Sequence, residues 1–389
     1  MRRLAGLLAV TLVAASAAGA ASAEVRQGPA GTRFYSPPTP LPAGRHGALI
    51  WARKLTGPAV LTSASVNELV LYRSVGFDGT PIAVSGTVAI PKGRAPKGGW
   101  PVISWAHATV GLADVCAPTR SDVLGGYERP LLNRWLRAGY AVVRTDYQGL
   151  GTPGGNPDLI GTSEAHTVLD IVRAAHAFDR ELDLHRVGLA GHSVGGHAAL
   201  WATALAPGYT PELGIRATVA FAPSSHLAAQ ATVLRSLTTP DGDLSAVAAT
   251  IVSATEFADP ALDVTSLLTP QGAALFPLVQ IDCEPALAAG PFASVAPASL
   301  FQPNADLSRL IGDLQANDPD GLTFHTPVRI EQGDADTVVL PTLTQALEQE
   351  YAAKGLPVSY ESYDGVDHFG LVTAAAADAT AYLERRLGH

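Results

Sequence analysis

The chain has 389 residues, 47% of them apolar, which is enough for a large core in one domain with an insertion or in two modest domains. The formal net charge is −9, and Lys and Arg are spread along the chain without forming a cluster. These features exclude the basic surface of a nucleic-acid-binding protein.

The first residues have the three parts of an export signal. Arg2 and Arg3 form a positive start, Leu4–Val13 is apolar, and Ala21-Ser22-Ala23 is a small-residue cleavage site. We therefore expect residues 1–23 to be a signal peptide cleaved after Ala23, and the mature protein to be secreted. The alternative is a retained membrane anchor, because the uncharged stretch continues to Ala23.

Two strands are predicted next. Residues 24–42 are rich in Pro, Gly and Ala and predict an extended N-terminal arm. Runs with strand composition follow at 66–75 and 82–90, with Asp78-Gly79 between them. An Asp-Gly turn between two alternating runs predicts an antiparallel hairpin.

The remainder of the chain has the pattern of a parallel sheet with helices. Short apolar runs without alternation are typical of strands buried on both faces, and they occur at 101–106, 140–145, 187–190, 218–222, 328–332 and 358–362. Helical patterns separate most of these runs, at 131–138, 165–178, 195–206, 342–353 and 371–387. Ser163 is the expected N-cap of the second helix. The sequence predicts an α/β fold with eight strands, mostly parallel and flanked by helices.

Residues 226–323 interrupt this alternation. They are rich in Ala, Leu and Pro, favour helices, and are too long for a plain connection. We expect a helical cap inserted into a catalytic domain formed by residues 24–225 and 324–389. The alternative, a separate C-terminal domain, is weaker because the strand pattern resumes after the insertion.

Gly191-His192-Ser193-Val194-Gly195 matches G-x-S-x-G, the tight strand-to-helix turn that exposes a nucleophilic serine. Alone, this match is a weak signal in a chain rich in glycine. Its context strengthens it, because a predicted strand precedes the motif and an Ala-rich helix follows it. Ser193 is therefore the candidate nucleophile.

An acid and a histidine should follow the serine in that order. Asp334 and Asp336 both lie after the seventh predicted strand, and we favour Asp336, just before the entry to the next helix. His368 lies in a loop with flanking glycines after the last strand. It would accept the proton of Ser193 and pass it to the leaving alkoxide, while Asp336 would fix its tautomer.

The oxyanion of the reaction needs backbone donors. The amide of Val194, directly after the nucleophile, is one candidate. The second should come from the loop after the third strand, where we favour Thr109 over Ala108. His107 in this loop is expected to brace it by hydrogen bonds.

Tyr147 lies in a Gly-rich segment, Asp146–Gly151, that closes the fourth strand. Two interpretations remain open for this segment. It is either a plain turn, or it brings Tyr147 to the wall of the active-site mouth.

The chain has two cysteines, Cys116 and Cys283. In an exported protein a disulfide between them is favoured over two unrelated buried thiols. Neither cysteine belongs to a C-x-x-C pair, so zinc and redox motifs are absent from the sequence. No metal or cofactor is expected.

With these motifs the chain resembles the secretory lipase family, which includes the Candida lipase A type and exported bacterial esterases. The resemblance covers nearly the whole mature chain and is carried by residues 104–109, 146–154, 191–197 and 332–336. It implies hydrolysis of carboxylesters or triacylglycerols without a metal, and a helical cap that shelters the acyl chain. Matched by position, it also implies a triad of Ser193, Asp336 and His368.

Two positions depart from the family pattern. Ala108 stands where similar bacterial sequences usually have Gly, and Val194 stands where they often have Gln. If residue 108 needs a positive φ, its methyl group would strain the oxyanion turn by about 1 kcal/mol.

The sequence thus predicts a secreted lipase or esterase with an acyl-enzyme intermediate and a backbone oxyanion hole. Its expected partners are small-molecule or lipid esters, with transient contact to a lipid surface, and the apolar composition of residues 226–323 favours apolar esters. One alternative is an exported peptidase or amidase of the same fold, although no anchor for a peptide amino terminus is evident. The other is a degenerate, non-catalytic binding protein, against which the intact order of serine, acid and histidine argues.

Overall fold

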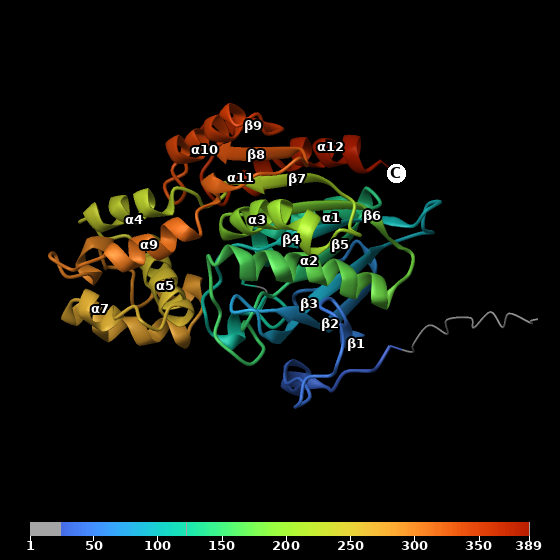
Figure 1. Ribbon diagram of the computed structural model, residues 1–389, viewed down its shortest axis with the longest axis horizontal. Coiled ribbons are helices and arrows are strands. Elements are labelled where there is room, and N and C mark those ends of the chain that lie inside the picture. The colour runs from blue at the N-terminus through green and yellow to red at the C-terminus, as the bar shows by residue number, and fades with distance from the viewer. Residues whose placement is uncertain (1–24, 122, 389) are drawn as a thin grey trace, which may run out of the picture.

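The computed structural model describes residues 25–121 and 123–388 (Figure 1). The predicted signal peptide, with its cleavage site at Ala23, lies outside these residues. Within the described part of the chain, no helix combines the length and the apolar character needed to cross a membrane.

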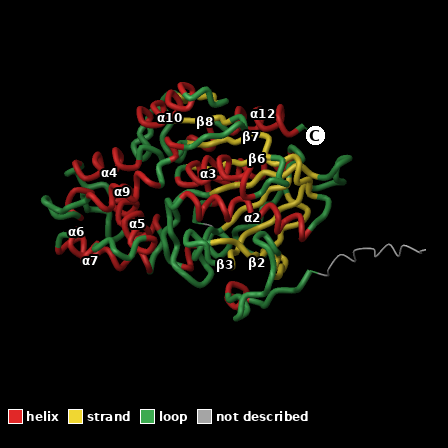
Figure 2. The backbone as a smooth tube through the Cα atoms, in the orientation of Figure 1, coloured by secondary structure: helices red, strands yellow, loops and turns green. Residues whose placement is uncertain are grey.

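A single mixed sheet forms the centre of the described chain, with strand order β1-β2-β3-β5-β4-β6-β7-β8-β9 (Figures 1 and 2). The pairs β1–β2, β2–β3 and β3–β5 are antiparallel, and all other neighbouring pairs are parallel. The strands are β1 Leu49–Lys54, β2 Ala64–Val75, β3 Pro81–Pro91, β4 Trp100–Ala106, β5 Ala141–Thr145, β6 Leu182–His192, β7 Ile215–Phe221, β8 Val328–Gly333 and β9 Val358–Tyr363. The predicted α/β architecture, with a hairpin before parallel strands, is confirmed.

The predicted number of eight strands is wrong by one. The ninth strand, β1, pairs antiparallel with β2 at the edge of the sheet. Its three central residues, Ile50, Trp51 and Ala52, are all buried, so it lacks the alternation of a half-exposed edge strand. Part of this burial comes from the N-terminal arm, whose Gly28 N–H donates to the Ala52 carbonyl at 2.9 Å.

Helices cover both faces of the sheet. On one face α2 and α3 share a core with the strands, and on the other α1, α11 and α12 do so. These helices, with α10 beside β8 and β9, are α1 Gly125–Arg137, α2 Gly161–Phe178, α3 Val194–Tyr209, α10 Pro341–Ala353, α11 Leu371–Ala374 and α12 Ala376–Leu387. The two cores hold the carboxyl ends of the parallel strands in fixed register.

The predicted cap of α2 is corrected by the structure. The helix begins at Gly161, so Ser163 lies inside it and donates its hydroxyl hydrogen to Gln148 Oε1 at 2.6 Å. The first N–H of the helix, that of Gly161, instead donates to Asn317 Oδ1 at 3.1 Å. This cap comes from 156 residues further along the chain, so the local sequence gave no sign of it.

Between β7 and β8 the chain forms helices that lie to one side of the sheet (Figure 1). They are α4 Leu227–Ser236, α5 Gly242–Ala258, α6 Val264–Leu267, α7 Pro270–Leu275, α8 Glu284–Ala289 and α9 Ser308–Ala316. We call α4–α9 the inserted helices. They share a hydrophobic core of their own, which also includes Leu112, Leu159 and Val194 from the sheet side.

The predicted disulfide between Cys116 and Cys283 is confirmed. It joins the segment after β4 to the N-cap residue of α8, with 5.3 Å between the two Cα atoms. Next to it, the Glu284 N–H donates to the Val110 carbonyl at 2.9 Å. The inserted helices are therefore fastened to the loop that was predicted to supply oxyanion donors.

Candidate active site

Ser193 lies on a sharp turn between β6 and α3, with a positive φ of 58°. Two glycines make this turn possible. A Cβ on Gly191 would lie 2.0 Å from the Gly195 carbonyl oxygen, and a Cβ on Gly195 would lie 2.0 Å from the Ala106 carbonyl oxygen. No side chain fits at either position. The backbone segments approach so closely here that the motif needs glycine at both ends.

His368 and Asp336 meet beyond the ends of β8 and β9. The distance from His368 Nδ1 to Asp336 Oδ2 is 2.7 Å. The other carboxylate oxygen accepts the N–H groups of Val338 and Val339 at 2.8 and 2.9 Å, and Gln332 Nε2 donates to Oδ2 at 3.2 Å. These donors fix the carboxylate, so Nδ1 carries a proton and Nε2 presents a lone pair.

The competing carboxylate, Asp334, makes a different contact. It is exposed, and its Oδ1 accepts the Gly365 N–H at 2.6 Å. This bond shapes the loop that leads to His368. Asp334 is a turn residue in this structure and does not touch the imidazole in any described contact.

Ser193 and His368 line the same cavity. Among the described residues no hydrogen bond joins the Ser193 hydroxyl to the His368 ring. Such bonds are often long in the absence of substrate and shorten when it binds. The two side chains therefore share the space that an ester would occupy.

His192, to which the sequence analysis assigned no role, directly precedes Ser193 and contacts His368. Its ring lies 4.4 Å from that of His368, and its Nε2 donates to the His368 carbonyl oxygen at 3.0 Å. The Tyr127 hydroxyl donates to Nδ1 at 3.2 Å. Burial, with a smaller contribution from His368, holds the pKa of His192 well below its usual value, so its ring is neutral. His192 thus fixes the backbone of His368.

The predicted oxyanion residues also border this cavity. Ala108, Thr109 and Val194 all line it. Within the described chain, the N–H groups of Thr109 and Val194 have no acceptor. Ala108 is not among the residues with a positive φ, so its methyl group does not strain the turn. Two free donors and a candidate nucleophile therefore border one space.

Buried aromatic side chains support the loop of Thr109. His107 Nδ1 donates to the Ala108 carbonyl at 2.7 Å, and burial lowers the pKa of His107 to about 4. Tyr147 is buried and is not among the residues that line the cavity. Its hydroxyl donates to the His107 carbonyl at 2.9 Å. Tyr147 and His107 thus support the loop on the side away from the cavity.

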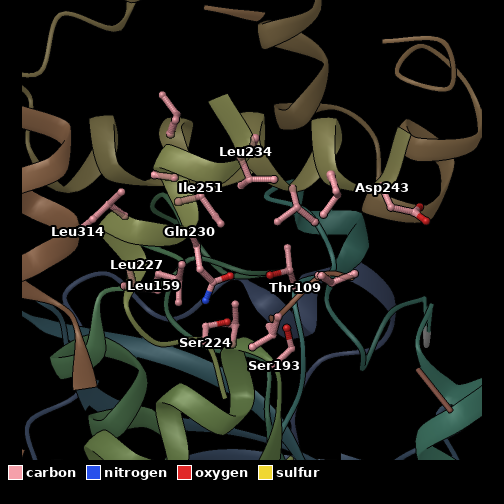
Figure 3. Close-up of a pocket in the computed structure, with 18 of the residues that line it drawn as sticks. Thr109, Leu159, Ser193, Ser224, Leu227, Gln230, Leu234, Asp243, Ile251 and Leu314 are labelled. Carbon is pink, nitrogen blue, oxygen red and sulfur yellow. The ribbon is translucent and has the colours of Figure 1, made fainter. Parts of the chain in front are cut away.

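The wall of the cavity is largely apolar. Figure 3 shows Ser193 and Thr109 at its base, with Leu234 and Ile251 projecting from the inserted helices above them. Leu227, Leu244, Val247 and Leu314 belong to the same wall. Among the described residues no three His, Cys, Asp or Glu side chains are grouped as metal ligands. The arrangement suits an apolar chain that ends in a reactive carbonyl group.

Comparison with known proteins agrees with this geometry. Residues 118–267, which include Ser193 and Val194, match the secretory lipase family. This part of the chain is similar to the secretory lipases. Among curated proteins, lipase A of Moesziomyces aphidis is 29% identical over 231 residues, or 55% of this chain and 48% of the relative. The chain thus spans about half the length of the curated relatives it matches.

Another relative is a probable inactive lipase of Mycobacterium tuberculosis. It is 29% identical over 217 residues, covering 51% of this chain and 46% of the relative. The crystal structure of Candida antarctica lipase A is similar over 89% of this chain and 85% of its own, with a TM-score of 0.72 and 23% identity. At this identity the structural likeness establishes the α/β-hydrolase fold alone. The family match ends before Asp336 and His368, so their roles must be argued from the site itself.

Proposed function

We propose that this chain is a secreted carboxylic-ester hydrolase, a lipase or esterase, that uses Ser193, His368 and Asp336 as its catalytic triad. The observation that carries this proposal is the position of His368. One ring nitrogen contacts a fixed carboxylate, and the side chain borders the apolar cavity that also contains Ser193. This arrangement suits proton transfer from a serine hydroxyl next to a bound apolar ester.

In the proposed reaction Ser193 Oγ attacks the ester carbonyl carbon while His368 Nε2 accepts its proton. Asp336 stabilises the imidazolium that forms. The negative oxygen of the tetrahedral intermediate accepts hydrogen bonds from the N–H groups of Val194 and Thr109. The Ala108 N–H is the alternative to that of Thr109. The intermediate expels the alkoxide, which takes the proton from His368. Water then releases the acyl group by the same steps.

We propose that residues 226–323 form a cap over this site and residues 24–225 and 324–389 the catalytic domain. The inserted helices supply the apolar wall above Ser193, which supports an acyl-binding role. Residues 1–23 would direct export, in keeping with the family's name. The proposed substrates are lipid or other apolar esters, with transient contact to a lipid surface.

The first test is labelling by a fluorophosphonate probe, together with turnover of nitrophenyl esters from acetate to palmitate. We expect labelling of the wild type and complete loss of labelling in Ser193→Ala. The variant should lose about 10⁶-fold in kcat, as expected when a triad serine is removed. An unlabelled wild type would instead favour a non-catalytic binding protein, an alternative that the inactive relative keeps relevant. Faster turnover of aminoacyl amides than of esters would favour a peptidase.

A second prediction concerns acyl length. Ile251→Trp fills part of the wall above Ser193, so we expect turnover of palmitate and octanoate esters to fall at least about tenfold while acetate turnover is retained, since each buried CH₂ contributes about 0.8 kcal/mol. The matched control is Val233→Trp on α4, an exposed position that does not line this cavity. The control should leave the chain-length profile unchanged. Parallel losses on acetate and palmitate would contradict an acyl-binding wall.

A further inference from the structure

Thr109 is attached to a buried carboxylate behind the oxyanion loop. Its hydroxyl donates to Asp158 Oδ2 at 3.0 Å. The Asp158 side chain is buried, and the charged groups that act on it among the described residues are Glu164 and His197, with no Lys or Arg. Burial, with repulsion from Glu164, raises the pKa of Asp158 to about 7. Burying a carboxyl group is costly unless it is hydrogen-bonded, and the Thr109 hydroxyl supplies such a bond here.

The turn that carries Asp158 is itself held in an unfavourable backbone conformation. Leu159, which lines the cavity, has a positive φ of 63°. Its N–H donates to Glu164 Oε1 at 2.8 Å, and the Ile160 N–H donates to the Pro157 carbonyl at 3.0 Å. A non-glycine residue in this region costs about 1–3 kcal/mol and persists only where its surroundings impose it. Glu164 supplies part of that constraint.

Glu164 in turn joins the helix of the candidate nucleophile. His197 lies one helical turn after Ser193 on α3, and its Nδ1 is 2.8 Å from Glu164 Oε2. Its Nε2 donates one proton to the Asn317 carbonyl at 2.8 Å. A second proton therefore lies between His197 Nδ1 and Glu164 Oε2. Glu164 raises the pKa of His197 against the opposing effect of burial. Thr109 is thus linked to α3 by its bond to Asp158, by the peptide bond from Asp158 to Leu159, and by the contacts of Glu164 with Leu159 and His197.

The two proposed oxyanion donors differ in how they are supported. Val194 is the first residue of α3, so the helix fixes its N–H. Thr109 lies in a loop without regular structure, where the carbonyl of the next residue, Val110, accepts the Glu284 N–H. Donors act on a developing charge only if they are held in place before the reaction. The loop therefore needs a second attachment, which the bond to Asp158 can supply.

We propose that Asp158 is a positioning residue of the oxyanion hole, which holds Thr109 in register with Val194 through the Glu164–His197 pair. The inference rests on the proposed function, because it assigns a support to the same oxyanion donors. Asp158 does not touch the substrate. Its effect is exerted on the position of the Thr109 N–H relative to the nucleophile helix.

The test compares two substitutions at Thr109, one that removes the hydroxyl and one that keeps it. Thr109→Val removes the hydroxyl and its bond to Asp158, whereas Thr109→Ser keeps both. For nitrophenyl butyrate we expect Thr109→Val to lower kcat about tenfold with KM unchanged, because donor position matters only in the transition state. Thr109→Ser keeps the bond to Asp158, so it should lose clearly less kcat than Thr109→Val. The affinity of a trifluoromethyl ketone inhibitor should fall in the same proportion as kcat/KM.

A double-mutant cycle tests whether Asp158 acts through this bond. Asp158→Asn keeps an acceptor and should lose little, whereas Asp158→Leu should resemble Thr109→Val. The combined Thr109→Val and Asp158→Leu variant should be no slower than the slower single variant. Multiplied losses in the double variant, or a wild-type kcat in Thr109→Val, would overturn the inference.

The control is a similar bond away from the cavity. The Ser74 hydroxyl donates to the buried carboxylate of Asp170 at 2.8 Å, and neither residue lines the cavity. Ser74→Ala should lower thermal stability and leave kcat unchanged. A wild type without ester turnover would overturn the proposed function and this inference together. An active wild type whose kcat is insensitive to Thr109→Val would overturn this inference alone.

Discussion

Replacing Asp336 by Asn is expected to lower kcat for ester hydrolysis by about 10⁴-fold while the protein stays folded. The reason lies in the donors around the carboxylate. Oδ1 accepts the N–H groups of Val338 and Val339, so the oxygen of an Asn side chain would keep that position. The amide NH₂ would then face His368 Nδ1. The ring would have to accept there and carry its proton on Nε2, where it could no longer take the proton of Ser193.

Asp334→Asn is the matched control for this experiment. Asp334 is exposed and accepts one bond, from the Gly365 N–H, which an amide oxygen can also accept. We expect kcat within about twofold of wild type, as for most surface substitutions. Stopped-flow or steady-state turnover of nitrophenyl butyrate, with thermal unfolding of each variant, separates the two results. An equal loss in both variants would argue that neither carboxylate fixes the tautomer of His368.

Most of the sheet was predictable because its strands are buried on both faces and form continuous apolar runs. β1 was not, since its burial depends partly on contacts with the N-terminal arm that only the folded chain brings together. The start of α2 was misplaced for the same kind of reason. The cap of its first N–H is Asn317, which belongs to the end of the insertion. Local patterns predict elements well when local residues supply their partners.

The residues of the candidate site also differ in how far the sequence alone predicts them. Ser193, Asp336 and His368 were proposed from a motif and from chain order, both of which are visible in a single sequence. His192, Asp158 and His197 were assigned no role, because their functions depend on partners that folding brings close. His197, for example, contacts Glu164 at a separation of 33 residues and Asn317 at 120. Their one shared signal is a polar side chain in an apolar setting, which becomes informative only once burial is known.

Removing the disulfide is the second substitution with a large expected effect. The Cys116–Cys283 bond closes a loop with a sequence separation of 167 residues, for which the chain-entropy model gives about 5 kcal/mol. We expect a double Cys116→Ser and Cys283→Ser variant to lose a large part of this free energy of unfolding. Urea titration followed by tryptophan fluorescence measures the loss, and an unchanged midpoint would contradict the prediction.

The same bond should matter for activity before the protein unfolds as a whole. It fastens α8 beside Val110, whose carbonyl accepts the Glu284 N–H, and Val110 directly follows Thr109. Without it, the inserted helices and the Thr109 loop lose a shared attachment, so ester turnover should fall at urea concentrations below the unfolding midpoint. Wild-type protein treated with dithiothreitol should behave like the double variant, and the reductant should not affect the variant itself. Coincident loss of activity and fluorescence in the variant would show that the bond stabilises the fold without supporting the oxyanion loop.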